Sequence, residues 1–145
     1  DPSREGNPEG ILSKQEVMNR SSIISPYIST PILIGATPLG GTFPIRLQSM
    51  TNTDTLDTKG SVAQCIRIIE AGADYIRLTA QGVREAENLA VIRGELRKAG
   101  FNTPLIADIH FNPLAAETAA RLVEKVRINP GNYADKRAGR REYFV

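Results

Sequence analysis

The side chains best suited to chemistry in this sequence lie at the ends of short apolar runs. The run Leu105–His110 contains Asp108 and ends at the chain's only histidine, and two similar runs carry Arg77 and Arg127. Arginine binds phosphate and carboxylate oxygens through paired hydrogen bonds, and a histidine beside an acid can donate to an anion. These residue types therefore predict an anion-binding site.

Short apolar runs alternate with helix-like segments along the chain, which predicts parallel strands joined by helices. The expected strands are Ile45–Met50, Tyr75–Ala80, Leu105–His110 and Lys125–Asn129. Helices are expected from Asp57 or Thr58 to a stop at Gly72, from about Val83 to Lys98 before Gly100, and from Asn112 and Pro113 onward. Their apolar stripes are Val62, Cys65, Ile66 and Ile69, then Ala86, Leu89, Ile92 and Leu96, then Ala116, Ala119, Ala120 and Val123.

Two observations favour a closed barrel over an open doubly wound sheet. No glycine-rich fingerprint follows the first strand, and polar residues stand at every strand end rather than at one switch point. The expected class is α/β, with parallel βα units forming the first half of a TIM-type barrel. Thr30–Ile34 and Phe43–Leu47, separated by glycines, predict a preceding β-hairpin or two short strands with an irregular loop.

The expected domain organisation is an N-terminal arm over residues 1–29, with a short helix near Lys14–Asn19, and a half-barrel over residues 30–145. Four βα repeats are half of an eight-stranded barrel, whose usual size is about 250 residues. The chain starts at Asp1 rather than at methionine, and its last residues resemble the middle of an element. We therefore expect a truncated piece of a longer protein.

Side chains alternate between the two faces of a strand, so position along each strand assigns its residues to a face. If the apolar faces meet the helices, one polar set points inward at the carboxyl ends of the strands. This set is Gln48, Arg77, Asp108, His110, Arg127 and Asn129. Buried polar groups are costly without partners, so the whole set predicts a ligand site. For any single pair, a structural ion pair of Arg77 or Arg127 with Asp108 that fills the barrel remains an open alternative.

Composition restricts the remaining function classes. A net charge of +2 gives no argument for nucleic acid binding, and the basic segment 136–141 has no interleaved aromatic residues that could stack on bases. No apolar run reaches the length of a membrane span. The single cysteine excludes an internal disulfide and favours a reducing compartment, and its place on an apolar stripe predicts packing rather than metal binding.

Four segments of the chain, in order, resemble 4-hydroxy-3-methylbut-2-enyl diphosphate synthase, the iron–sulfur enzyme of the methylerythritol phosphate route to isoprenoids. They are Pro44–Thr53 (PIRLQSMTNT), Glu70–Thr79 (EAGADYIRLT), Ala107–Phe111 (ADIHF) and Arg127–Asn132 (RINPGN). The similarity extends from about Ile32 to Arg137. Within it, Leu33–Gly41 resembles the hairpin that precedes the family's barrel, and Asn132–Arg137 resembles its three-domain variant.

The resemblance implies a TIM-type barrel that binds 2-C-methyl-D-erythritol 2,4-cyclodiphosphate, which the family opens reductively with electrons from ferredoxin or flavodoxin. By motif, Arg77, His110 and Arg127 would hold the diphosphate, while Gln48, Asp108 and Asn129 would orient the ring and its hydroxyls. The family's [4Fe–4S] cluster is held by three cysteines and a glutamate in a separate C-terminal domain, so its ligands would lie outside this chain. The resemblance thus implies an oxidoreductase part that is inactive alone, without catalytic or metal-binding residues. It implies bacterial cytoplasm, or plastid stroma in a plant.

Two alternatives remain at this point. Asp and Asn side chains at strand ends could read a pterin ring as well as a polyol, which would indicate a pterin-binding transferase barrel. A half-barrel could instead pair with another copy of itself to cover its exposed sheet edges, as a non-catalytic self-associating protein.

Overall fold

The computed structural model of this chain describes residues 27–131 and 133. Its elements are β1 (Ile32–Ile34), β2 (Thr37–Leu39), β3 (Gln48–Met50), α2 (Thr58–Glu70), β4 (Tyr75–Ala80), α3 (Val83–Lys98), β5 (Leu105–Ile109), α4 (Pro113–Ala120) and β6 (Lys125–Ile128). None of the described helices is both long and apolar enough to cross a bilayer. The predicted helix near residues 14–19, most of the predicted arm and the basic segment 136–141 lie outside the described residues.

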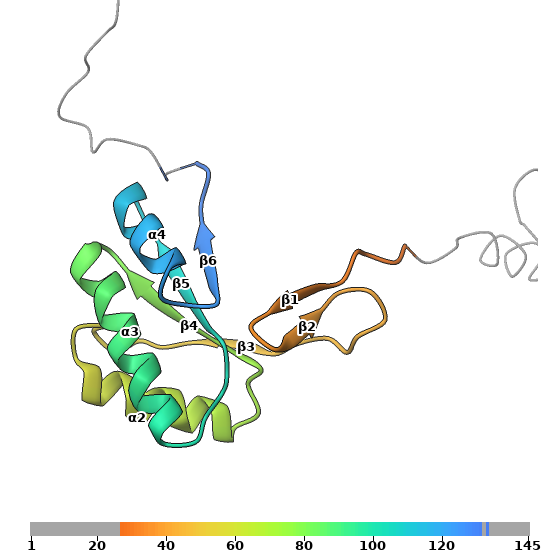
Figure 1. Cartoon of the computed structure of the whole chain (residues 1–145), viewed down its shortest axis with the longest axis horizontal. Helices are drawn as coiled ribbons and strands as arrows, with labels where there is room; N and C mark the ends of the chain where they lie inside the picture. The colour runs from red at the N-terminus through yellow and green to blue at the C-terminus, as the bar shows by residue number, and fades with distance from the viewer. Residues whose placement is uncertain (1–26, 132, 134–145) are drawn as a thin grey trace, which may run out of the picture.

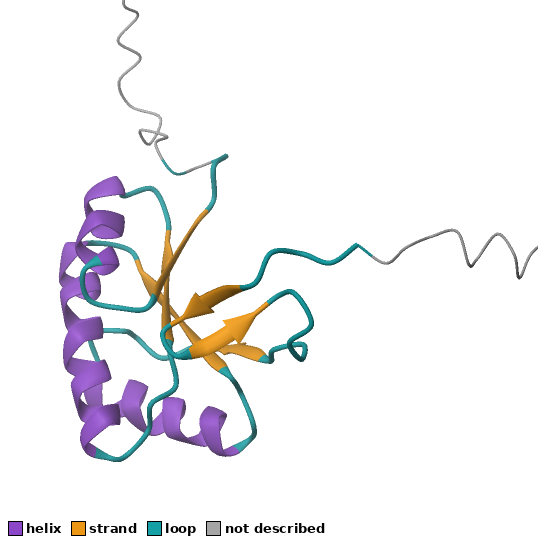
Figure 2. Ribbon diagram, turned by 45° about the vertical axis from the view of Figure 1, so that its right-hand side comes forward, coloured by secondary structure: helices purple, strands orange, loops and turns teal. Residues whose placement is uncertain are grey.

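The main sheet is parallel and has four strands in the order β3-β4-β5-β6, as the alternation of strands and helices predicted. The three helices cover one face of this sheet, and the antiparallel pair β1-β2 lies on the other side (Figures 1 and 2). This arrangement is a partial TIM-type barrel, because the side without helices is the side that a closed barrel would enclose. The predicted fold class is therefore confirmed.

α2 and α3 begin and end where the sequence signals placed them, and α4 begins as predicted but ends at Ala120, before Val123 of the predicted stripe. The Asp57 carboxylate accepts from the Gly60 N–H at 3.0 Å and caps α2, and the Asn112 side chain accepts from Ala115 N–H at 3.2 Å and caps α4. Gly72 and Gly100 follow α2 and α3 with φ of 99° and 89°, a conformation that glycine adopts without steric cost. Local hydrogen bonding thus fixes the helix limits.

The core lies between the helices and the sheet, and it contains most of the predicted stripes. Its fully buried members include Cys65, Ala86, Leu89, Ile92 and Leu96 from the helices and Ile76, Leu78, Leu105, Ala107 and Ile109 from the strands. The prediction for the last helix needs one correction: Ala120 is exposed because it is the final residue of α4, and Ala115 is buried instead. Parity along β4 and β5 assigned their helix-facing residues correctly.

The hairpin is shorter than predicted, and its second strand was wrongly placed. β2 follows β1 after a two-residue turn at Gly35 and Ala36, with Ile34 opposite Thr37. The segment 43–47 forms no strand. Its Arg46 donates from Nε to the Pro38 carbonyl at 2.9 Å and from Nη1 to Asp74 at 3.2 Å, so the segment is held by side-chain contacts instead of a strand ladder.

The first strand of the series was also predicted too long. Regular pairing begins only at Gln48, because the Leu47 N–H donates to the Asp74 carboxylate at 2.8 Å rather than to a neighbouring strand. Ile45 and Leu47 are 93% and 61% exposed, so their apolar character did not reflect burial against the helices. The last two strands, by contrast, end one residue earlier than expected, before His110 and Asn129.

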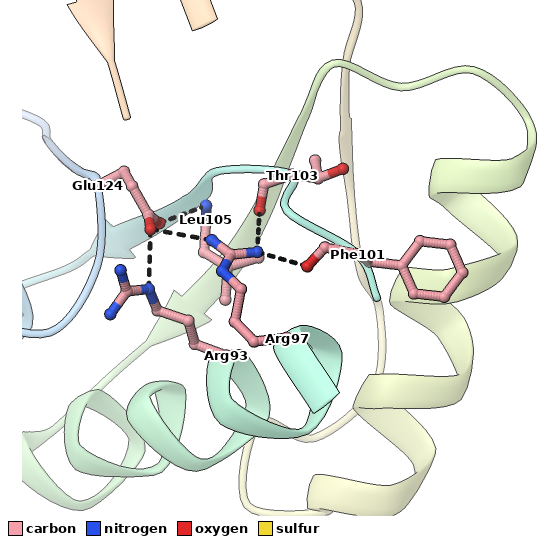
Figure 3. Close-up of polar contacts among 6 residues, drawn as sticks. All are labelled: Arg93, Arg97, Phe101, Thr103, Leu105 and Glu124. Carbon is pink, nitrogen blue, oxygen red and sulfur yellow. Dashed lines mark hydrogen bonds and ion pairs between the residues drawn. The ribbon is translucent and has the colours of Figure 1, made fainter. Parts of the chain in front are cut away.

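One carboxylate joins three elements at the amino-terminal end of the sheet. Glu124 precedes β6, and its side chain accepts from Arg93 Nε at 2.8 Å, from Arg97 Nη2 at 3.0 Å and from the Leu105 N–H at 2.9 Å (Figure 3). Burial would by itself raise the pKa of Glu124, but the Leu105 N–H and Arg93 favour the charged form, so its pKa lies below the ordinary 4.5. The charged form of Glu124 therefore stabilises the fold.

We predict that Glu124→Gln lowers the free energy of unfolding of the barrel by about 2 kcal/mol at pH 7, since it removes the negative charge that accepts three hydrogen bonds. A carboxyl whose pKa is lowered on folding contributes stability above its unfolded pKa and loses it as the pH falls through the folded pKa. The two proteins should therefore converge below the ordinary carboxyl pKa of 4.5. Urea denaturation from pH 7 to pH 3, with hydrogen exchange of β5, measures both effects.

The matched control is Glu95→Gln, which removes an i,i+3 ion pair to Lys98 whose side chains are 46% and 75% exposed. Such surface pairs are worth about 0.5 kcal/mol or less, so this variant should differ little from the parent at any pH. Equal losses in the two variants would contradict the role assigned to Glu124.

Candidate functional site

Strand register brings the candidate residues together at the carboxyl end of the sheet. Asp108 on β5 is the Cα partner of Thr79 on β4, and it is also the Cα partner of Arg127 on β6. Arg77 precedes Thr79 by two residues and His110 follows Asp108 by two, so both belong to the same face. That face is opposite the helices.

Asp108 is the centre of this cluster. It is 2% exposed, and its Oδ1 accepts from Arg127 Nη1 at 2.9 Å. Its Oδ2 lies 3.5 Å from Arg77 Nε and 3.5 Å from His110 Nε2. A buried carboxylate needs cationic or hydrogen-bonding partners, and three basic side chains from three consecutive segments supply them. We call Arg77, Asp108, His110 and Arg127 the Asp108 cluster.

Arg77 is only partly satisfied within this cluster. Its Nε is buried and lies within ion-pair distance of Asp108, yet the geometry does not make a hydrogen bond with any of the described residues. Its Nη2 donates to the Met50 sulfur at 3.2 Å, which is a weak acceptor. Unmet buried donors are uncommon in native structures and are found at sites that bind ligands or water. Arg77 therefore has donor capacity for a ligand oxygen.

The charge balance of this face favours an anion. Lys125 is the partner of Ile106 in the β5-β6 register and stands two residues before Arg127, so it shares the inner face. Three permanent cations thus accompany the single Asp108 carboxylate there. Arg77, Arg127 and His110 are 30%, 41% and 34% exposed at their side chains, so they reach the open end of the sheet. An anionic ligand there could contact all three.

The turn after β5 holds His110 in place at the open end. Phe111 has a φ of 57°, a left-handed conformation that is uncommon for a non-glycine residue and occurs where surrounding structure enforces it. Its ring centroid is 6.3 Å from that of His110. The chain then enters α4 through the Asn112 cap described above. This turn directs His110 back toward Asp108.

Two of the predicted site residues are not part of the Asp108 cluster. Gln48 is the Cα partner of Tyr75, the first residue of β4, so it lies toward the amino-terminal end of the sheet and not at the predicted mouth. Alternation of side chains along the strand gave the face on which Gln48 lies, but it could not give the position of Gln48 relative to the residues of the neighbouring strand. Asn129 lies just beyond β6, where its Oδ1 accepts from the Gly131 N–H at 3.1 Å.

Sequence reasoning left Thr79 and Lys125 out of the site. Both belong to the inner face: Thr79 is the Cα partner of Asp108, and Lys125, the Cα partner of Ile106, precedes Arg127 by two residues on β6. Side chains two residues apart on a strand share a face, so the alternation that selected Arg77 and Arg127 also places Thr79 and Lys125 on the inner face. Applying this alternation to every residue of the two strands would have found them.

The hairpin closes this face below the cluster. Ile34 and Leu39 pack against Tyr75 and Ile106, and the Tyr75 hydroxyl donates to the Thr37 carbonyl at 3.3 Å. Burial raises the pKa of Tyr75 above its ordinary 10.0, the Arg46 charge lowers it by a smaller amount, and the Asp74 charge adds to the increase. Tyr75 and Ile106 are inward-facing residues that the sequence had not marked as core. The described part of the site is therefore closed at its lower end by apolar packing.

The described residues do not fit an iron–sulfur cluster. No group of three or more His, Cys, Asp or Glu side chains among them is arranged to hold a metal. Cys65 is fully buried in the helix-facing core, and burial raises the pKa of its thiol to about 11, so it is protonated at neutral pH. Cys65 is surrounded by apolar side chains of this core and belongs to no group of potential metal ligands among the described residues, so it is a packing residue.

Four parallel strands with helices on one face define the class of protein, a barrel of the TIM type, and the charged cluster lies at the carboxyl ends of the strands, where the sites of such barrels usually lie. Residues 29–142 match the family model described as "GcpE TIM-barrel domain". The chain belongs to this family.

The curated relatives agree with this assignment. The chain is 66% identical over 103 residues to a protein of Parabacteroides distasonis, and 64% identical over 107 residues to one of Phocaeicola vulgatus. A third relative, from Porphyromonas gingivalis, is 62% identical over 106 residues. All three are named 4-hydroxy-3-methylbut-2-en-1-yl diphosphate synthase (flavodoxin). The matches cover 71%, 74% and 73% of this chain but only 17%, 17% and 18% of the relatives, so the chain spans under a fifth of their length.

We predict that Asp108→Asn destabilises the barrel by about 2 kcal/mol, less than for a fully enclosed pair because both arginines reach solvent. Adding Arg127→Met to Asp108→Asn should recover part of this loss, since it removes a cation that has lost its partner. A double-mutant cycle measured by urea denaturation of the full-length protein gives the coupling energy. Additive effects of the two changes would contradict the assignment of Asp108 as the group that holds Arg127.

Proposed function

We propose that this chain is the substrate-binding first half of the barrel of a 4-hydroxy-3-methylbut-2-en-1-yl diphosphate synthase, and that it binds 2-C-methyl-D-erythritol 2,4-cyclodiphosphate. Family membership and the names of the relatives support the enzyme class. The observation that carries the ligand assignment is the Asp108 cluster, in which two arginines from neighbouring strands and a histidine from the turn after β5 surround one carboxylate at the barrel's open end.

The proposed roles follow from the charge of the side chains in the Asp108 cluster and from their positions. Arg77 and Arg127 bind the diphosphate oxygens, for which their planar groups offer paired donors, and His110 donates a further hydrogen bond. Asp108 is a positioning residue, because it is buried and contacts all three of these groups. Asn129 adjoins the cluster and would contact the ring hydroxyls. Gln48 lies too near the amino-terminal end of the sheet to support the ring-orienting role expected for it.

For the full-length protein, we propose a reductive ring opening with flavodoxin as electron donor, the donor printed in the relatives' names. Ferredoxin is the alternative donor that the resemblance implies. A [4Fe–4S] cluster would supply the electrons when bound, and we place its ligands outside the described residues because Cys65 does not fit. The relatives are bacterial, and we place the protein in the bacterial cytoplasm.

The pterin alternative finds less support in the site. A pterin ring would be read by amide and carboxylate groups, whereas the cluster offers an excess of cations around a carboxylate that is already engaged by Arg127. The self-association predicted for a half-barrel with open edges stays a separate prediction, for which light scattering is the measurement.

We predict that Arg127→Ala and Arg77→Ala in the reconstituted full-length protein each raise the KM for the cyclic diphosphate at least about tenfold, since each removes charge-assisted hydrogen bonds. Steady-state reduction assays with flavodoxin measure this effect. Arg121→Ala is the matched control, because Arg121 is an exposed arginine at the far end of α4, and its KM should not change.

Circular dichroism of each variant separates loss of binding from loss of folding. Folded Arg77→Ala and Arg127→Ala proteins with the parent's KM and kcat would overturn the site assignment. Tight binding of a pterin and no binding of the cyclic diphosphate would replace the proposed function with its alternative.

A further inference from the structure

A hollow lies beside the Asp108 cluster at the same end of the sheet. It has a volume of about 370 Å³ and lies between the loop that follows β3 and the start of α3. The lining side chains that matter here are those of Asn52, Asp54, Thr79, Gln81 and Glu85. Thr79 joins the hollow to the cluster, because it is the register partner of Asp108 on the same face.

The loop that forms one wall is held in place from two helices. The Gln64 side chain on α2 accepts from the Asn52 and Thr53 N–H groups at 3.1 and 3.2 Å and donates to Asn52 Oδ1 at 2.6 Å. Asn88 on α3 donates to the Thr55 carbonyl at 2.6 Å. A loop fixed by side chains of the scaffold keeps its shape before a ligand arrives, which lowers the entropy cost of binding.

The second wall presents polar groups that the protein itself does not use. Within residues 27–131 and 133, no hydrogen bond engages the Thr79 hydroxyl, the Gln81 amide or the Glu85 carboxylate. The Thr79 carbonyl, by contrast, accepts from the Thr55 hydroxyl at 2.6 Å, which fixes this strand end against the loop. The hollow thus offers both donors and acceptors on rigid supports.

The charge of the lining residues determines which ligand groups this hollow can bind. Asp54 and Glu85 are its two ionisable lining residues, and both are acids. Carboxylates repel a phosphate but accept hydrogen bonds from hydroxyl groups. The adjoining Asp108 cluster has the opposite preference. A molecule with phosphates at one side and hydroxyls at the other would match both halves.

We propose that this hollow binds the hydroxyl-bearing carbon skeleton of the ligand whose phosphates bind the Asp108 cluster, with Thr79 and Gln81 as specificity-determining residues. The proposal rests on the proposed function and adds a polyol subsite to it.

The test compares two probes on the full-length protein by isothermal titration calorimetry. Inorganic diphosphate reports on the cationic cluster alone, and 2-C-methyl-D-erythritol 2,4-cyclodiphosphate reports on both halves. Gln81→Ala and Thr79→Val should each weaken the cyclic diphosphate about five- to tenfold, the effect of one lost hydrogen bond, and leave inorganic diphosphate unchanged. Arg127→Ala should weaken both probes.

Asn102→Ala is the matched control, since it removes an exposed amide from the loop between α3 and β5 at the other end of the sheet. Gln81 is exposed and Thr79→Val preserves shape, so both variants should fold. Parent affinity for both probes in Gln81→Ala and Thr79→Val would overturn the polyol subsite and leave the proposed function standing. Weakening of both probes to the same extent would also overturn it. Parent affinity for both probes in Arg127→Ala would instead overturn the proposed function.

Discussion

The site depends on burying one carboxylate in the middle of a parallel sheet. Asp108 is almost inaccessible to water, and an isolated charge there would be strongly unfavourable. Its neighbours on two strands must therefore supply positive charge, and Arg77 and Arg127 do so, while His110 from the following turn adds a polar contact. The same requirement that stabilises this part of the sheet also concentrates cations at its open end. One arrangement thus provides both the structural ion pairs and the cations that an anionic ligand would need.

The contacts at the two ends of the sheet have different roles. At the amino-terminal end, Glu124 joins α3 to the start of β5, and Arg46 with Asp74 attaches the hairpin region to the barrel. These contacts are fully satisfied and serve stability. At the carboxyl end, Arg77 keeps a buried donor without a hydrogen-bond partner and Phe111 has a left-handed backbone. Features that cost stability are thus grouped where a ligand would bind, as is usual in barrels of this type.

Most of the fold could be predicted from local signals. Capping at Asp57 and Asn112, glycine after two helices and the two-residue alternation of β4 each depend on neighbours within a few positions. The hairpin could not be predicted as well. Phe43–Leu47 has strand-like composition, but the tight turn at Gly35 brings β2 to β1 first, and the later segment is left to side-chain contacts. Composition alone cannot decide between two competing partners for one strand.

The sequence by itself determined which face of each strand carries the polar side chains, because alternation is a property of a single extended chain. It also determined the order of the strands, the limits of α2 and α3 and the start of α4. Only the tertiary structure decided which polar residues contact one another, since the register between neighbouring strands is set by interstrand hydrogen bonds. That register placed Arg127 and Thr79 beside Asp108, and it left Gln48 beside Tyr75 near the opposite end.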